Sequence, residues 1–244
     1  MKLVCHIGTP KTASTFLQNT FAGNRDWLLG HGVLFPELLT PHPNHITLFY
    51  AAAEKMHPFA RDYGLKSRDD LAAFRERMRA TITQRVAQAP KGVHTMLVSS
   101  ENLTGNLHKA EAIQTLHDLF RPHFDEIRII VYLRRQDDAM LSMWGEHMRR
   151  GFNGRTFSQF VETCFGPRSL TRYLYYRRLL SNWSEVFGRG ALDVRLFDRD
   201  HLEGGDILVD FMTALFGRRL PPLAQLTRGE VDNIGLAAPV LEFL

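Results

Sequence analysis

The architecture of this 244-residue chain follows from Cys5-His-Ile-Gly-Thr-Pro-Lys-Thr-Ala-Ser-Thr-Phe16. The apolar run over residues 3–7 is short and ends at Gly8, which predicts a buried strand that leads into a tight turn. A helix is expected over residues 13–21. Free backbone N–H groups, the positive end of this helix and the Lys11 ammonium then converge on one point. Such an arrangement predicts a binding site for a phosphorylated ligand.

Outside this segment, short apolar runs alternate with helical patterns. Strands are expected over residues 32–36, 95–100, 127–133 and 192–197, and helices over 46–55, from 67 to about 90, and over 136–150, 173–187 and 206–216. This alternation predicts a three-layer α/β fold with about five parallel strands, helices on both faces, and ligands at the carboxyl ends of the strands.

The chain is expected to form one domain over residues 1–244, because no internal repeat or linker divides it. Residues 237–244 resemble a helix that begins at a proline and stops within two or three turns. We therefore expect the natural protein to continue past Leu244. The sequence does not determine the oligomeric state.

Composition restricts the class of protein. The 30 Lys and Arg residues exceed the 26 Asp and Glu residues by four, an excess that suits anionic ligands but gives no reason to expect nucleic acid. The two cysteines, Cys5 and Cys164, form neither a disulfide framework nor a metal cluster. No signal peptide and no stretch of eighteen apolar residues is present in the sequence, so we expect a soluble, cytoplasmic protein.

The N-terminal loop differs from that of nucleoside triphosphatases. Their pattern, Gly-x-x-x-x-Gly-Lys-[Ser/Thr], requires glycines at positions 5 and 10 when its lysine is Lys11, but the chain has Cys5 and Pro10 there. An ordinary ATPase or GTPase loop is therefore disfavoured.

The segment Pro10-Lys-Thr-Ala-Ser-Thr-Phe-Leu-Gln18 instead resembles the 5′-phosphosulfate loop of sulfotransferases that use 3′-phosphoadenosine 5′-phosphosulfate (PAPS), above all bacterial members of the carbohydrate type. The resemblance implies that Lys11 bridges the phosphosulfate and stabilises the leaving oxygen. It also implies that the backbone from Thr12 to Thr15, with the hydroxyls of Ser14 and Thr15, holds the 5′-phosphate.

Two positions of the loop depart from the pattern of that family. Phe16 replaces a frequent tryptophan and is expected to stack on adenine. Ala13 replaces the usual glycine. This departure matters only if the position needs a positive φ, because a helix-starting conformation accepts alanine without strain.

A second segment, Val131-Tyr-Leu-Arg-Arg-Gln-Asp-Asp-Ala-Met-Leu-Ser142, supplies the arginine and serine with which the family holds the 3′-phosphate. By the same resemblance Arg134 and Ser142, eight positions apart, fill these roles, and a guanidinium suits phosphate geometry. The residue eight positions after Arg135 is Met143, which cannot bind phosphate. Arg135 is therefore expected to cap a helix or to pair with Asp137 or Asp138.

Sulfuryl transfer needs a base that takes the proton of the acceptor, and two residues are candidates. Glu101 follows the strand at residues 95–100, and family members that act on sugars or protein tyrosines commonly use a glutamate. His45, in a loop after the second strand, is the alternative, as base or as acceptor-binding residue. His6 is expected in the core. No metal site is predicted, because six further histidines lack a companion at ligand spacing: His94, His108, His117, His123, His147 and His201.

These features predict an enzyme that moves a sulfuryl group from PAPS to a hydroxyl or amine and releases adenosine 3′,5′-bisphosphate. The resemblance implies a carbohydrate or glycolipid acceptor. Two alternatives remain: a kinase of related fold, for which Glu101 is the one attractive Mg²⁺ ligand, and a catalytically inactive nucleotide-binding protein.

Overall fold

A computed structural model describes residues 1–151, 156–165, 172–217 and 220–230 of the chain. Its strands are β1 (Lys2–His6), β2 (Val33–Leu34), β3 (Thr95–Ser99), β4 (Glu126–Leu133) and β5 (Leu192–Leu196). They form one sheet in the order β2-β3-β1-β4-β5, and every neighbouring pair is parallel. The predicted α/β fold with a parallel sheet of five strands is confirmed. The helix expected over residues 237–244 lies outside the described residues.

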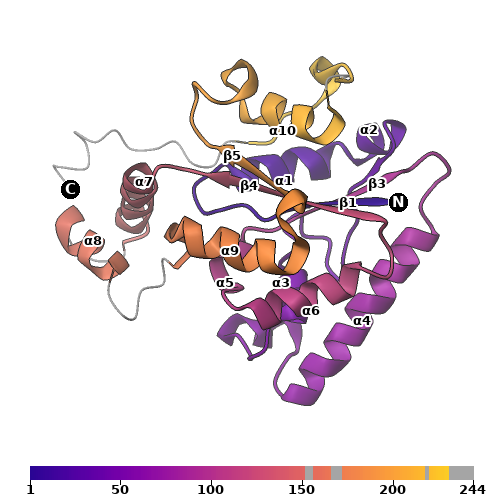
Figure 1. Ribbon diagram of the computed structural model, residues 1–244, viewed down its shortest axis with the longest axis horizontal. Helices are drawn as coiled ribbons and strands as arrows, with labels where there is room; N and C mark the ends of the chain where they lie inside the picture. The colour runs from indigo at the N-terminus through magenta and orange to yellow at the C-terminus, as the bar shows by residue number, and fades with distance from the viewer. Residues whose placement is uncertain (152–155, 166–171, 218–219, 231–244) are drawn as a thin grey trace.

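Helices cover both faces of this sheet (Figure 1). One face carries α1 (Ser14–Gly23), α2 (Arg25–Gly30) and α10 (Ile207–Phe216). The other carries α3 (Ile46–Ala52), α4 (Arg68–Ala87), α6 (Ala110–Phe120) and α9 (Tyr176–Phe187). Helices α5 (Asn102–Asn106), α7 (Gln136–Arg149) and α8 (Phe157–Phe165) complete the described set. The domain is therefore a three-layer sandwich.

The central strand β1 shows why the sequence folds this way. Leu3, Cys5 and Ile7 point into the core on the side of α3, α4, α6 and α9, whereas Val4 points into the core on the side of α1 and α10. All four are buried. A strand that is apolar on both faces belongs at the centre of a parallel sheet, because helices must cover both of its sides.

Local sequence patterns predicted some of the helices but not others. The Ser67 hydroxyl accepts the Asp70 N–H at 3.1 Å while the Asp70 carboxylate accepts the Ser67 N–H at 2.8 Å, so a capping box starts α4, the helix expected from residue 67. The helices α2, α5, α6 and α8 were not predicted. Of the described helices, none combines the length with the apolar character that crossing a bilayer demands.

The sheet brings three strand ends together. His6, the last residue of β1, is the register partner of Ser99 on β3 and of Ile130 on β4. The loop after β1 therefore lies between Glu101, which follows β3, and Arg134, which follows β4. This is the edge at which open α/β sheets bind ligands.

Candidate active site

The loop between β1 and α1 is anchored by buried threonines. The Thr9 hydroxyl donates to the Tyr132 carbonyl on β4 at 2.7 Å, and the Thr104 hydroxyl of α5 donates to the Gly8 carbonyl at 2.6 Å. The Thr12 hydroxyl donates within the loop to the Thr9 carbonyl at 2.6 Å. These bonds to elements on both sides of β1 give the loop a fixed shape, and they leave the hydroxyl of Thr12 committed to the loop itself.

Two residues of the loop adopt the left-handed conformation. Lys11 has φ of 67°, and Ala13, at the N-terminal cap of α1, has φ of 59° and ψ of 26°. Of the two conformations that the sequence left open for Ala13, the structure shows the one with positive φ: its backbone occupies a region that glycine adopts freely and that costs alanine energy. A left-handed residue followed by a helical one turns successive N–H groups toward a common point, which is a concavity suited to an anion.

The first turn of α1 carries the predicted phosphate ligands Ser14 and Thr15. Their N–H groups, with that of Phe16, have no acceptor within the helix. Ser14 is only 3% exposed, and its hydroxyl oxygen has no hydrogen-bond partner among the described residues. Thr15 is partly buried. The turn thus combines free donors with a buried hydroxyl.

The Phe16 ring, predicted to stack on adenine, belongs largely to the core on the α10 side and is 8% exposed. The guanidinium carbon of Arg228 lies 5.5 Å from the centroid of this ring. Arg228 is held by an ion pair of 2.6 Å with Asp206. The sequence analysis did not single out Arg228, which lies more than two hundred positions from Phe16.

The ammonium of Lys11 points to a carboxylate. Its Nζ lies 3.2 Å from Oε2 of Glu146 on α7, and the exposed fractions of the two side chains are 9% and 26%. The second oxygen of Glu146 forms an ion pair of 2.5 Å with Arg150, the residue that follows α7. Glu146 was missed from the sequence, although it lies four positions after Ser142 and therefore on the same face of α7.

Glu101 lies at the start of α5, where β3 ends. Burial raises the pKa of its carboxyl, and the neighbouring Glu146 carboxylate raises it further, whereas Lys11 and Arg150 act to lower it. Glu101, Glu146 and Lys11 are therefore close enough to influence one another. A partly buried carboxylate with a raised pKa is a better proton acceptor than an ordinary glutamate.

His45 is placed quite differently. Its ring is 2% exposed. Nδ1 accepts the Ser99 N–H at 3.0 Å, and Nε2 donates to the Pro36 carbonyl at 2.8 Å. Burial lowers the pKa of His45 to about 4. Both ring nitrogens thus serve the backbone that joins β3 to the loop before α3, and this arrangement favours Glu101 as the base.

Arg134 joins the second predicted segment to the first. Its Nη1 donates to the carbonyl of Lys11 at 3.3 Å, and its guanidinium lies 5.8 Å from the centroid of the Phe197 ring. The Arg134 carbonyl accepts a hydrogen bond from Tyr176 at 2.5 Å. Ser142 is partly buried on α7, one turn ahead of Glu146.

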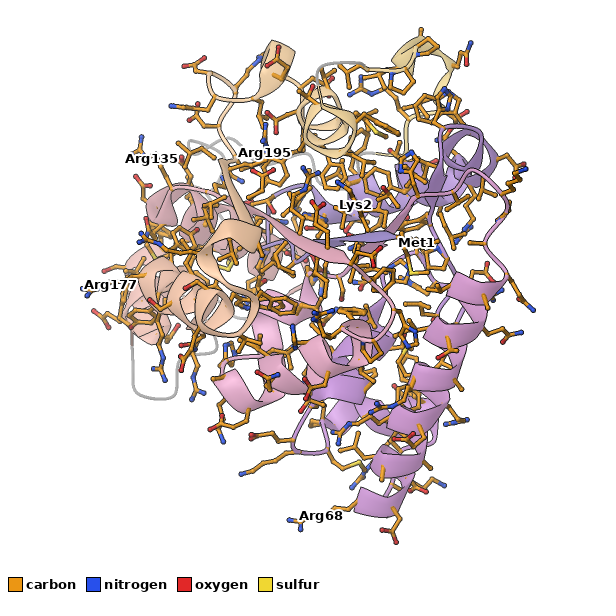
Figure 2. All side chains as sticks on the ribbon, turned by 45° about the vertical axis from the view of Figure 1, so that its right-hand side comes forward. Met1, Lys2, Arg68, Arg135, Arg177 and Arg195 are labelled. Carbon is orange, nitrogen blue, oxygen red and sulfur yellow. The ribbon has the colours of Figure 1, made fainter. Side chains whose placement is uncertain are left out.

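The two adjacent arginines, Arg134 and Arg135, have different surroundings. Arg135 forms an ion pair of 2.6 Å with Asp137, as predicted, and its side chain is 72% exposed. Figure 2 shows Arg135 at the outer edge of the molecule. One arginine thus faces the loop after β1 and the other faces solvent.

No protein-family model matches the chain. An uncharacterized protein of Archaeoglobus fulgidus is 31% identical over 88 residues, which is 36% of this chain; the match spans 22% of that protein's length. The crystal structure of a sulfotransferase from Alicyclobacillus acidocaldarius is similar over 98% of this chain and 87% of that one, with a TM-score of 0.52 and 15% identity. The chain therefore has the P-loop-like α/β fold of a sulfotransferase of known structure.

Proposed function

We propose that this protein is a sulfotransferase that moves a sulfuryl group from PAPS to a hydroxyl or amine acceptor. The observation that carries the proposal is the hydrogen bond from the Arg134 guanidinium to the Lys11 carbonyl. It joins the two segments that resemble the family's 5′-phosphosulfate and 3′-phosphate sites. A ligand with two separate phosphate ends suits two cationic groups at the ends of neighbouring strands, β1 and β4.

The loop would hold the 5′-phosphate of the donor through the backbone N–H groups from Thr12 to Thr15 and through the hydroxyls of Ser14 and Thr15. Arg134 and Ser142 would hold the 3′-phosphate. Phe16 is the proposed contact for adenine, with Arg228 on the face of its ring.

The transfer itself is an in-line displacement at sulfur. The acceptor oxygen or nitrogen forms a bond to sulfur while the bond between sulfur and the bridging oxygen of the 5′-phosphate breaks. Glu101 takes the proton of the acceptor, and the positive charge of Lys11 offsets the charge that develops on the bridging oxygen. Adenosine 3′,5′-bisphosphate and the sulfated acceptor leave.

Lys11 must change partner for this role. Its ion pair with Glu146 keeps the ammonium beside the loop, and a donor phosphosulfate would compete with the carboxylate for it. Glu146 remains joined to Arg150, which limits the cost of losing Lys11.

We propose a carbohydrate or glycolipid acceptor, on the resemblance of the loop to carbohydrate-type members.

The variant Glu101→Gln tests the assignment of the base. Bisphosphate affinity should match that of the unaltered protein, whereas sulfuryl transfer from labelled PAPS to a panel of sugar and lipid acceptors should fall about 10²- to 10⁴-fold. Glu111→Gln is the matched control, because Glu111 also lies in the first turn of a helix but is exposed. Full activity of Glu101→Gln would exclude Glu101 as the base.

A further inference from the structure

A buried chain of three polar side chains lies beneath the loop after β1. Gln18 of α1 donates from Nε2 to the Ser99 hydroxyl oxygen at 3.1 Å, and this oxygen lies 2.8 Å from Nδ1 of His6. Gln18 is 4% exposed, and His6 and Ser99 are fully buried. His6 and Ser99 are the last residues of β1 and β3 and partners in the register, so the sheet itself holds this pair together.

The hydrogen bonds that join Gln18, Ser99 and His6 determine the tautomer of His6. The Gln18 amide nitrogen can only donate, so the Ser99 oxygen accepts from it. Among the described residues the Ser99 hydroxyl has one other partner, Nδ1 of His6, and its own proton finds an acceptor only if it goes to that nitrogen. Burial lowers the pKa of His6 to about 3, so the ring is neutral and carries one proton. With Nδ1 as acceptor, that proton is on Nε2, which makes Nε2–H a donor.

Nε2 faces the inner side of the Gly8 turn together with the hydroxyl of Ser14. A Cβ placed on Gly8 would lie 3.2 Å from Nε2 of His6 and 2.2 Å from Oγ of Ser14. Neither atom has a hydrogen-bond partner among the residues described, although both are buried. A buried donor or acceptor without a partner destabilises the folded state, so two such groups on one side of a turn require an explanation.

We infer that His6 is a positioning residue for Ser14, acting when the donor binds. Nε2–H donates to the Ser14 oxygen, directly or across one water, and the Ser14 proton is thereby directed outward to an oxygen of the donor's 5′-phosphate. The inference rests on the proposed function, because it requires that phosphate. A hydroxyl that already accepts a hydrogen bond from a donor-only group presents a donor to its ligand, which suits an oxyanion.

The alternative is that His6 serves only the packing of the core. Its ring makes edge contacts with Tyr132 and Phe211, at centroid distances of 6.1 and 5.3 Å. Packing alone does not predict any energetic link between His6 and the Ser14 hydroxyl. A double-mutant cycle distinguishes the two roles, because it measures that link and cancels general loss of stability.

The cycle uses His6→Phe, Ser14→Ala and the double variant, with the affinity for adenosine 3′,5′-bisphosphate measured by calorimetry. Phenylalanine keeps an aromatic ring in contact with Tyr132 and Phe211. We expect His6→Phe to weaken binding about tenfold when Ser14 is present and less than about threefold when it is absent. Equal weakening in both backgrounds would overturn the inference.

Two further variants keep the test decisive. Ser99→Ala removes the hydroxyl that sets the tautomer and leaves His6 in place, so its effect should also depend on Ser14. His45→Phe is the control, because His45 is a buried histidine beside Ser99 that bonds the backbone instead. Its effect on bisphosphate affinity should be the same with and without the Ser14 hydroxyl.

Nitrogen NMR of histidine-labelled, ligand-free protein gives a reading that does not depend on the proposed function. The His6 signals, identified by their loss in His6→Phe, should show a neutral ring protonated at Nε2 from pH 8 to pH 5. A ring protonated at Nδ1 would overturn the inference. If the unaltered protein did not bind bisphosphate while the tautomer was as expected, the proposed function would fail, and with it the role of His6 in donor binding.

Discussion

The Lys11 ammonium lies 3.2 Å from the Glu146 carboxylate, although 135 positions separate the two residues in the sequence. The contact joins the loop after β1 to helix α7, which also carries Ser142. It places a negative charge beside both the lysine of the loop and the Glu101 carboxyl, whose pKa it helps to raise. Glu146 therefore competes with a bound phosphate for the Lys11 ammonium, and it raises the pKa of Glu101, the proposed base.

Replacing Glu146 by glutamine should act on both neighbours. Bisphosphate affinity should rise by a few fold, because the Glu146 carboxylate no longer competes with the phosphate for the Lys11 ammonium. The acid limb of the pH profile of kcat/KM should move to lower pH, because one of the causes that raise the pKa of Glu101 is gone. Glu76→Gln, a change at an exposed glutamate of α4, should alter neither. An unchanged pH profile would contradict this account of Glu146.

The two adjacent arginines offer a matched pair. Arg134→Ala should weaken bisphosphate binding about 10- to 100-fold, as expected for the loss of a charged hydrogen-bond donor to a phosphate. Arg135→Ala should change the affinity by less than about twofold, since Arg135 is exposed and paired with Asp137. Calorimetry on both variants measures the difference. Similar losses for the two would remove the reason for assigning the 3′-phosphate to Arg134.

The left-handed backbone of Ala13 predicts a gain from glycine. Ala13→Gly relieves a strain of roughly 1–2 kcal/mol but increases the entropy of the unfolded chain by roughly 0.4–1 kcal/mol, so the free energy of unfolding should rise by about 0.5 kcal/mol. Ala73→Gly on the exposed side of α4 should instead lower it by about 1 kcal/mol. Urea unfolding measures both. A loss of stability in Ala13→Gly would show that the loop does not hold this conformation in solution.

The buried histidines predict how stability depends on pH. The pKa values of His6 and His45 are lowered in the folded state to about 3 and about 4, from 6.5. The stability that these neutral rings contribute is present above pH 6.5 and is lost as the pH falls toward the pKa values of the folded state. The reason is that the histidines of the unfolded chain become protonated in this range, whereas those of the folded protein stay neutral. Each histidine should add about 1.4 kcal/mol per pH unit to the slope of the free energy of unfolding against pH, between pH 6 and pH 4.5.

The variants His6→Phe and His45→Phe should each reduce the slope of the free energy of unfolding against pH by up to about 1.4 kcal/mol per pH unit, which corresponds to one proton. Urea unfolding at a series of pH values between 8 and 4.5 measures it. A slope that neither variant changes would mean that these rings are protonated in the folded protein, contrary to their burial.

Much of the fold could be predicted because its signals are local. The apolar runs at β1 and β4 are short, continuous and bounded by polar residues, which identifies buried parallel strands. The Ser67 capping box likewise depends on residues three positions apart. The helix α6 was missed even though Ile113, Leu116 and Phe120 recur at helical spacing and are fully buried. That pattern was available in the sequence.

The site was predictable only in part, for a physical reason. Lys11 and Ser14 lie three positions apart, in a loop and the helix turn that follows it, and the residue types of this segment already indicate an anion site. The contacts of Glu146 with Lys11 and of Arg228 with Phe16 join elements far apart in the sequence, and no spacing reveals them. The sequence left the conformation of Ala13 open, because the anchored loop, and not the preference of alanine, decides it.

The central claim is that the site binds a nucleotide with phosphates at both the 3′ and 5′ positions. Thermal unfolding of the unaltered protein with adenosine 3′,5′-bisphosphate, or with ADP and Mg²⁺, tests it most directly, because a ligand that binds only the folded state raises Tm by mass action. The account predicts a clear rise in Tm with the bisphosphate and a much smaller one with ADP and Mg²⁺. The reverse order would contradict it and favour a kinase.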